Sequence, residues 1–255
     1  GHPFGKDIAN RGLYRALARH GGFDHLCFLT QETPSPQVWR DQLQPAAGTQ
    51  VARAELGNLQ APRQAGTLLR GQPYLAELAW ARAHLGDHQA YSLTGVIHTL
   101  APPRVRELIG DCLVAPVQPW DALICTSSAV RDRVQDLFDQ WQEHLAGRLG
   151  STRQPRPLFP LIPLGVEAEA LRSQAGDGGA RQFLRNHLRL DREDVLVLWL
   201  GRLSFYEKAF PQPMFIALQR AAHLSGRRLQ FAMAGWFPGG EDDHRRYREA
   251  ARHHA

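Results

Sequence analysis

The chain has 255 residues, of which 43% are hydrophobic and 22% are charged, so the composition is that of a globular protein and excludes a disordered one. Lysine and arginine outnumber aspartate and glutamate by 30 to 25. This mild positive charge suits an anionic ligand, an anionic membrane surface or nucleic acid, and selects none of them.

Helical and strand-like patterns alternate from the start of the chain. We expect a loop at residues 1–6, a helix at 7–20 and a short buried strand at 26–30. Residues 31–72 are rich in Gln, Pro, Gly and Arg and have weak periodicity, which predicts a loop-rich insertion with one short helix. The next predicted elements are a helix at 74–85, a strand at 91–98, a helix from Pro102, a strand at 120–126 and a long helix capped by Ser127 or Ser128.

The alternation continues in the last third of the chain. Residues 159–167 read as a strand followed by a turn, and residues 180–190 as a helix. Residues 195–200 are a continuous apolar run, which is typical of a strand buried on both faces of a parallel sheet. A helix from Pro213, a buried strand at 229–235 and a charged helix from Glu241 complete the prediction.

This order of elements predicts the α/β class with parallel sheets. An α/β unit would need a strand before residue 1, and the unit beginning at Val195 is too small for a sheet of usual size. We therefore expect the chain to be trimmed at both ends. Cys27, Cys112 and Cys125 lack metal-ligand spacing and are expected to be reduced, partly buried thiols of a cytoplasmic protein.

Two cations follow the apolar run at 195–200. Gly201 allows a tight turn or the close approach of a ligand, and Arg202 and Lys208 flank the short loop after it. Cations at the carboxyl end of a buried strand, beside a helix start, indicate an anion site. The alternative is two solvated surface cations. The only other lysine, Lys6, also lies in a glycine-containing segment.

Four segments are similar, in the right order, to segments of one protein family. They are residues 121–127, residues 162–167 (IPLGVE), residues 198–204 together with Lys208, and residues 231–235. This set resembles GT-B glycosyltransferases of family 4, in which the corresponding segments are a late strand and serine of the first domain, the crossover to the second domain, the donor-phosphate element and the next strand. The chain departs from that pattern at Leu164 and Ala209, in the spacing of Arg202 to Lys208, and in lacking the family's carboxylate pair.

The resemblance implies two Rossmann-like parallel-sheet domains that face a cleft. Residues 1–167 would form the acceptor-side domain, and residues 168–255 the start of the nucleotide-sugar domain, incomplete in this chain. The implied activity is a metal-independent, retaining transfer of a hexose from a nucleotide-diphosphate sugar to an acceptor hydroxyl, without a cofactor. The implied acceptor is a carbohydrate or a lipid-linked molecule.

The resemblance also assigns site residues. Arg202 and Lys208 would stabilise the departing diphosphate, and His98, at a strand end, would contact the transferred sugar or the acceptor hydroxyl. The alternative for His98 is a structural or surface histidine. The implied catalytic residues are His98, Arg202 and Lys208, and the implied donor-binding residues are Gly5, Lys6, Gly201, Arg202, Lys208 and Gly235.

Other interpretations of the candidate residues stay open. Gly5 and Lys6 would otherwise belong to a disordered terminus, and Gly235 would be an ordinary turn glycine. Gly165 is expected to shape the crossover turn, and Ser127 is better explained as a helix cap than as a ligand.

One competing function is a non-catalytic nucleotide- or sugar-binding module of a larger protein, which the missing carboxylate pair favours. Another is a dinucleotide-dependent oxidoreductase, which is disfavoured because no Gly-x-Gly-x-x-Gly follows a strand. Nucleic-acid binding is weaker, since no aromatic platform accompanies the dispersed basic residues. Arg11, Arg15 and Arg19 suggest a peripheral contact with the inner membrane face, although a solvated basic helix face is the favoured interpretation.

Overall fold

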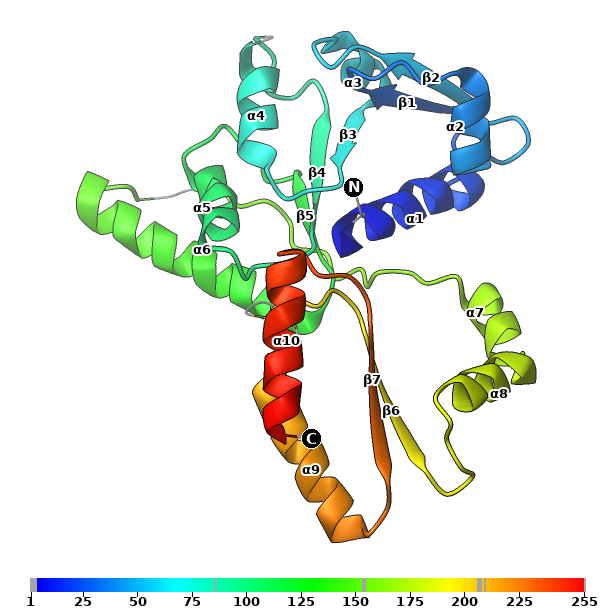
Figure 1. The fold of residues 1–255 in the computed structure, drawn as a ribbon. Coiled ribbons are helices and arrows are strands. Elements are labelled where there is room, and N and C mark those ends of the chain that lie inside the picture. The colour runs from blue at the N-terminus through cyan, green and yellow to red at the C-terminus, as the bar shows by residue number, and fades with distance from the viewer. Residues whose placement is uncertain (1–3, 85, 153–154, 206–207, 209, 255) are drawn as a thin grey trace. The chain divides into compact units, whose positions relative to one another are not determined.

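The computed structural model describes residues 4–84, 86–152, 155–205, 208 and 210–254 (Figure 1). Helices and strands alternate, and the strand pairs in its three small sheets are parallel, which confirms the α/β class. The chain divides into two compact units, Gly1–Val166 (unit 1) and Glu167–Ala255 (unit 2). Leu85 and Ala209, which entered the sequence interpretation, lie outside the described residues.

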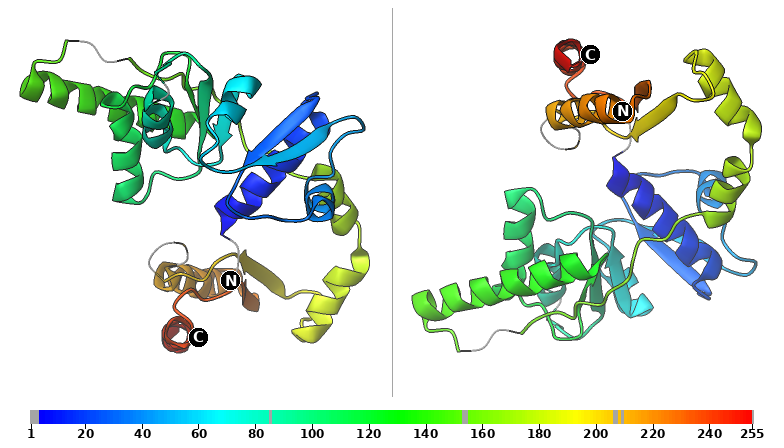
Figure 2. Two further views of the ribbon diagram at one scale, coloured as in Figure 1. Left: turned by 90° about the horizontal axis from the view of Figure 1, so that it is seen from above. Right: turned by 90° about the horizontal axis from the view of Figure 1, so that it is seen from below.

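Unit 1 contains two parallel sheets, one with the order β1-β2 and the other β3-β4-β5. Figure 2 shows α1 running beside the β1-β2 pair in both views. Its elements are α1 (Gly5–His20), β1 (His25–Leu29), α2 (Pro36–Leu43), β2 (Gln50–Ala54), α3 (Gln60–Ala65), β3 (Thr67–Arg70), α4 (Leu75–His84), β4 (Ser92–Ile97), α5 (Pro103–Gly110), the 3-10 turn η1 (Asp111–Leu113), β5 (Ala122–Cys125) and α6 (Ser128–Leu149).

The apolar core of unit 1 lies around the β3-β4-β5 sheet. Leu93 and Ile97 of β4 and Leu123 of β5 are fully buried against Leu75 of α4 and Phe138 of α6. The helices α4 and α6 and the strands β4 and β5 were predicted from the sequence, and the structure confirms them. The Ser127 hydroxyl accepts the backbone N–H of Val130 at 3.2 Å, so its role as the cap of α6 is confirmed too.

The expectation for residues 31–72 is wrong. This segment forms two helices and two strands instead of a loop with one helix. The strands were missed because β2 has the sequence QVARA and is mostly exposed, and β3 has the sequence TLLR. Neither segment is long or apolar enough to stand out from its polar surroundings, and parallel pairing with β1 and β4 supplies the missing stabilisation.

The strand expected at 159–167 is only partly formed. Leu158 and Leu161 make isolated parallel bridges to β5, and the backbone N–H of Cys125 donates to the Pro160 carbonyl at 2.8 Å. Pro160 and Pro163 have no N–H to donate, so the segment follows β5 without becoming a regular strand.

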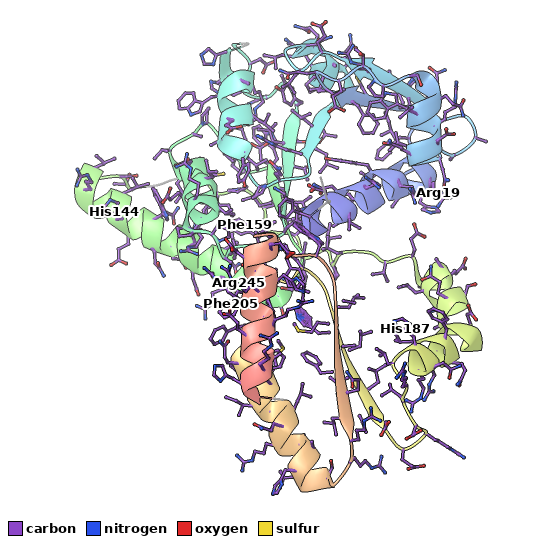
Figure 3. The ribbon with its side chains drawn as sticks, viewed as in Figure 1. Arg19, His144, Phe159, His187, Phe205 and Arg245 are labelled. Atoms are coloured by element: carbon purple, nitrogen blue, oxygen red, sulfur yellow. The ribbon has the colours of Figure 1, made fainter. Side chains whose placement is uncertain are left out.

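Unit 2 is a parallel strand pair with helices. Its elements are α7 (Ala168–Ala175), α8 (Gly178–His187), β6 (Val195–Leu200), α9 (Pro211–Ser225), β7 (Leu229–Ala234) and α10 (Glu241–His254). Leu203 and Tyr247 are its buried centre, and Trp199, Phe205, Met233 and Phe237 pack around them. Figure 3 labels Phe205, whose ring lies edge-on to that of Tyr247 with 5.7 Å between the centroids.

The run at 195–200 forms the predicted strand, but the expectation that it is buried on both faces is wrong. Leu198 is 51% exposed and Leu200 is 73% exposed, while the alternate residues Val197 and Trp199 are half-buried. One face of β6 therefore packs on unit 2 and the other meets solvent. The continuous apolar run does not reveal this, because it has no polar face to mark the exposed side.

The three cysteines are free thiols that differ in exposure. Cys112 and Cys125 are buried free thiols, and burial raises the pKa of Cys112 to about 12, but Cys27 is exposed rather than partly buried. Within the described residues, no helix combines the length and apolar character needed to cross a bilayer.

Candidate functional site

His98 is the first residue after β4, and Gly71 is the first residue after β3. The two strands are parallel neighbours, so both residues lie at the same edge of the sheet. The His98 Nε2 atom is 3.2 Å from the Gly71 carbonyl oxygen. This edge is where an α/β sheet most often places a binding site.

Helix α1 covers this edge through two polar side chains one turn apart. The Asn10 amide nitrogen donates to the Gly71 carbonyl at 2.9 Å, and the Asn10 carbonyl oxygen is 2.8 Å from Nε2 of His98. The Tyr14 hydroxyl accepts the Gly71 N–H at 3.0 Å. We call Asn10, Tyr14, Gly71 and His98 the His98 cluster.

The pKa of His98 is lowered in this cluster. Burial is the main cause, because the imidazolium form loses hydration. The hydrogen bond to the Gly71 carbonyl raises the pKa, the positive charge of Lys6 lowers it, and the negative charge of Asp7 raises it. The neutral imidazole is therefore the dominant form at neutral pH.

This shift predicts how unit 1 responds to acid. Since the pKa of His98 is lower in the folded chain than the value of about 6.5 in an unfolded one, the unfolded chain binds more protons below that pH. We expect the free energy of unfolding of the wild-type chain to decrease relative to that of His98→Gln as the pH falls below about 6.5. Urea unfolding at a series of pH values measures the difference, and a difference independent of pH would contradict the prediction.

A second prediction concerns Gly71. A Cβ there would lie 2.6 Å from Cγ and Nδ2 of Asn10, so Gly71→Ala should displace the Asn10 side chain and destabilise unit 1 by about 1–3 kcal/mol. Gly12→Ala in α1 is the matched control, because nothing lies within 4 Å of its added Cβ and alanine favours a helix by about 1 kcal/mol. Equal effects of the two substitutions on denaturant unfolding would show that Asn10 is not tightly seated.

Gly5 and Lys6 lie in the first turn of α1, so the expected loop at residues 1–6 is wrong at these two positions. The helix begins early because the Asp7 carboxylate accepts the Phe4 N–H at 2.9 Å and closes the first turn. Both residues are exposed. Lys6 acts electrostatically on His98, so the structure brings these two predicted site residues into one neighbourhood.

In unit 2 the structure brings together Gly201 and Gly235. They directly follow β6 and β7, whose last residues Leu200 and Ala234 are paired. A Cβ at Gly235 would overlap with the carbonyl oxygen of Gly201, and Gly201 itself has φ 152°. The close contact of the two strand ends therefore requires glycine at both positions, whatever ligand this edge binds.

Arg202 and Lys208 lie on the segment that leaves this edge. Arg202 is half-buried and Lys208 is exposed, and the Lys208 N–H donates to the Ser204 carbonyl at 3.2 Å. The Leu203 N–H donates to the Trp236 carbonyl at 2.9 Å, which continues the pairing beyond Gly201. The segment that carries both cations is thus tied to the end of β7.

The arginines of α1 have neighbours in unit 1. The Arg15 guanidinium donates to the Gln42 carbonyl at 3.1 Å, and that of Arg19 (Figure 3) donates to the Gln44 side-chain oxygen at 2.5 Å. Both bonds go to the carboxyl end of α2, where carbonyl groups concentrate partial negative charge. Part of the basic face of α1 therefore serves to dock α2.

Among the residues that the structure describes, no three histidine, cysteine, aspartate or glutamate side chains are grouped in a way that would hold a metal ion. The polar atoms of the His98 cluster form hydrogen bonds with one another.

Sequence reasoning missed Asn10, Tyr14 and Gly71. The four-residue spacing of Asn10 and Tyr14 places them on one face of α1, and this is the only signal that precedes the structure. Asn10 is 61 residues from Gly71 and 88 residues from His98, and Tyr14 is 57 residues from Gly71. No local sequence pattern therefore connects them.

Comparison of the chain with known protein families, with curated proteins and with solved structures finds no match.

Proposed function

We propose that this chain is part of a retaining, metal-independent hexosyltransferase of the GT-B type that uses a nucleotide-diphosphate sugar as donor. The observation that carries the proposal is the segment from Gly201 to Lys208. It places a half-buried arginine and an exposed lysine after a parallel strand, at an edge where Gly201 and Gly235 bring two backbones into close contact. Positive charge at this edge suits a diphosphate.

The chemistry of glycosyl transfer needs such a site. The bond between the anomeric carbon of the sugar and the diphosphate oxygen breaks, and negative charge develops on the departing oxygen. The acceptor oxygen forms the new bond to the anomeric carbon, and the proton of the acceptor hydroxyl passes to the departing diphosphate. Arg202 presents a planar fork of N–H donors to phosphate oxygens, and Lys208 adds a mobile point charge. Groups that bind this charge more strongly in the transition state than in the ground state accelerate the reaction.

In this proposal unit 1 contributes His98. As a neutral imidazole it accepts a hydrogen bond from a hydroxyl group of the transferred sugar or of the acceptor. Lys6, which is close enough to influence the pKa of His98, adds a positive charge on the same side of unit 1. The acceptor is a carbohydrate or a lipid-linked molecule, and residues 31–72 are the segment proposed to select it.

The second candidate is a non-catalytic module that binds a nucleotide or a sugar. The absence of the resembling family's carboxylate pair from these 255 residues favours it. The two candidates differ in one observable. Binding of a nucleoside diphosphate is compatible with both candidates, and only the enzyme releases it from a nucleotide sugar when an acceptor is present.

Calorimetry with UDP, GDP and ADP, and with the hexose-bearing nucleotide sugar of each, tests the proposal. We expect one nucleotide series to bind to the wild-type chain and to lose affinity in Arg202→Ala. Arg227→Ala is the matched control, because this exposed arginine precedes β7, at the opposite end of the same strand pair. Failure of all three nucleotides to bind, or equal losses in both variants, would contradict the proposal.

A further inference from the structure

The orientation of the Asn10 side chain is determined by a backbone group. The Gly71 carbonyl oxygen can only accept a hydrogen bond, and the Asn10 amide atom facing it at 2.9 Å must therefore be the NH₂ nitrogen. The reversed amide would place two oxygens against each other. The Asn10 atom that faces His98 is then the carbonyl oxygen.

The same reasoning determines the proton on His98. Nε2 is 2.8 Å from the Asn10 Oδ1 atom and 3.2 Å from the Gly71 carbonyl oxygen, and both partners are acceptors only. An unprotonated Nε2 would direct its lone pair at two oxygens. The neutral ring therefore carries its proton on Nε2, and Nδ1 holds the lone pair.

Two features hold Asn10 in this position. Tyr14, one turn further along α1, accepts the Gly71 N–H at 3.0 Å, so α1 binds both backbone polar groups of Gly71. The missing side chain at Gly71 also leaves the space that the Asn10 amide occupies. The backbone at the end of β3 thus determines the orientation of the Asn10 amide, and the amide determines which nitrogen of the His98 imidazole is protonated.

From this geometry we infer that Asn10 is a positioning residue, which holds His98 in the Nε2-protonated tautomer and so makes Nδ1 the atom that accepts a hydrogen bond from a substrate hydroxyl. The tautomer follows from unit 1 alone, whereas the hydroxyl partner rests on the proposed function. Burial of the ring, which lowers the pKa of His98, supports the assignment because it favours the neutral form that has a tautomer to select. The charged groups that act on the ring are Lys6 and Asp7, both on α1.

Nitrogen NMR of the isotope-labelled chain tests the tautomer directly. The chain has 12 histidines, and the His98 signals are identified as those missing from His98→Gln. We expect the shifts of a neutral ring with a protonated Nε2 and an unprotonated Nδ1. A protonated Nδ1 in the wild-type chain would overturn the inference, and this measurement needs no variant other than the one used for assignment.

Asn10→Ala tests the positioning role. It should shift the His98 signals away from the pure Nε2-protonated form and, in a transfer assay, lower kcat by up to about 10²-fold, because the substrate hydroxyl is then positioned less accurately. Asn58→Ala is the matched control, because the Asn58 side chain accepts backbone N–H groups at the start of α3 and makes no bond to the His98 cluster. An unchanged tautomer in folded Asn10→Ala would overturn the role of Asn10.

The two proposals fail in different ways. A wrong tautomer in the wild-type chain refutes the inference and leaves glycosyl transfer standing. An Nε2-protonated ring that Asn10→Ala perturbs, together with nucleotide binding that does not depend on Arg202, refutes the proposed function and leaves the positioning of His98 intact.

Discussion

Arg82→Met is expected to destabilise unit 1 by about 3–5 kcal/mol, the usual effect of removing one member of a buried ion pair. The Arg82 and Asp121 side chains are both 0% exposed. Their contact is bidentate, with Nη1 of Arg82 2.8 Å from Oδ1 of Asp121 and Nη2 2.7 Å from Oδ2. Methionine fills a similar volume but leaves the Asp121 carboxylate buried without its counter-charge.

The pair also connects segments that are distant along the chain. Asp121 accepts the backbone N–H groups of Leu93 at 2.7 Å and of Gln118 at 2.8 Å, and Arg82 donates to the Tyr91 carbonyl at 2.7 Å. The network therefore ties α4 to the start of β4 and to the turn before β5. A loss of this size is a large part of the 5–15 kcal/mol that typically stabilises a domain.

Denaturant unfolding of unit 1, followed by a signal specific to that unit, measures the effect. Arg104→Met is the matched control, because the Arg104–Glu107 pair is 72% and 55% exposed and pairs of that kind contribute at most about 1 kcal/mol. The double variant Arg82→Met/Asp121→Leu should lose less than the sum of the single losses, since it leaves no buried charge unpaired. Additive losses would show that the two side chains are not coupled.

Arg202→Ala is expected to lower kcat/KM for glycosyl transfer about 10²- to 10³-fold, which corresponds to about 2.7–4 kcal/mol of transition-state stabilisation. In the proposed function, the half-buried guanidinium near the end of β6 would meet more charge on the departing diphosphate than on the bound donor. The loss should appear mainly in kcat, since uniform binding would change KM instead.

Two companion variants sharpen this result. Arg202→Lys keeps the charge but removes the planar fork, so it should fall between the wild-type chain and Arg202→Ala. Lys208→Ala should show a smaller loss, because Lys208 is exposed and its charge is better screened by solvent. If Arg202→Ala and Arg227→Ala lower kcat/KM equally, the site does not lie at the end of β6.

The sequence alone predicted most elements of the fold where periodicity was strong. The apolar stripe of α6 and the runs at β4, β5, β6 and β7 are local features, and Ser127 signals a helix start because its cap bond spans three residues. The spacing of Leu75, Ala79 and Arg82 also places all three on one side of α4. Short polar strands such as β2 escaped prediction, because only pairing with a neighbouring strand makes them strands.

The tertiary structure alone decided how residues far apart in the sequence meet. It paired Arg82 with Asp121, 39 residues away, and it set Asn10 against His98, 88 residues away. It also showed that Gly235 is glycine because the Gly201 carbonyl fills the place of a side chain. A sequence pattern reports the period of one element, whereas the pKa and tautomer of His98 depend on contacts among α1, β3 and β4, which exist only after these elements have packed together.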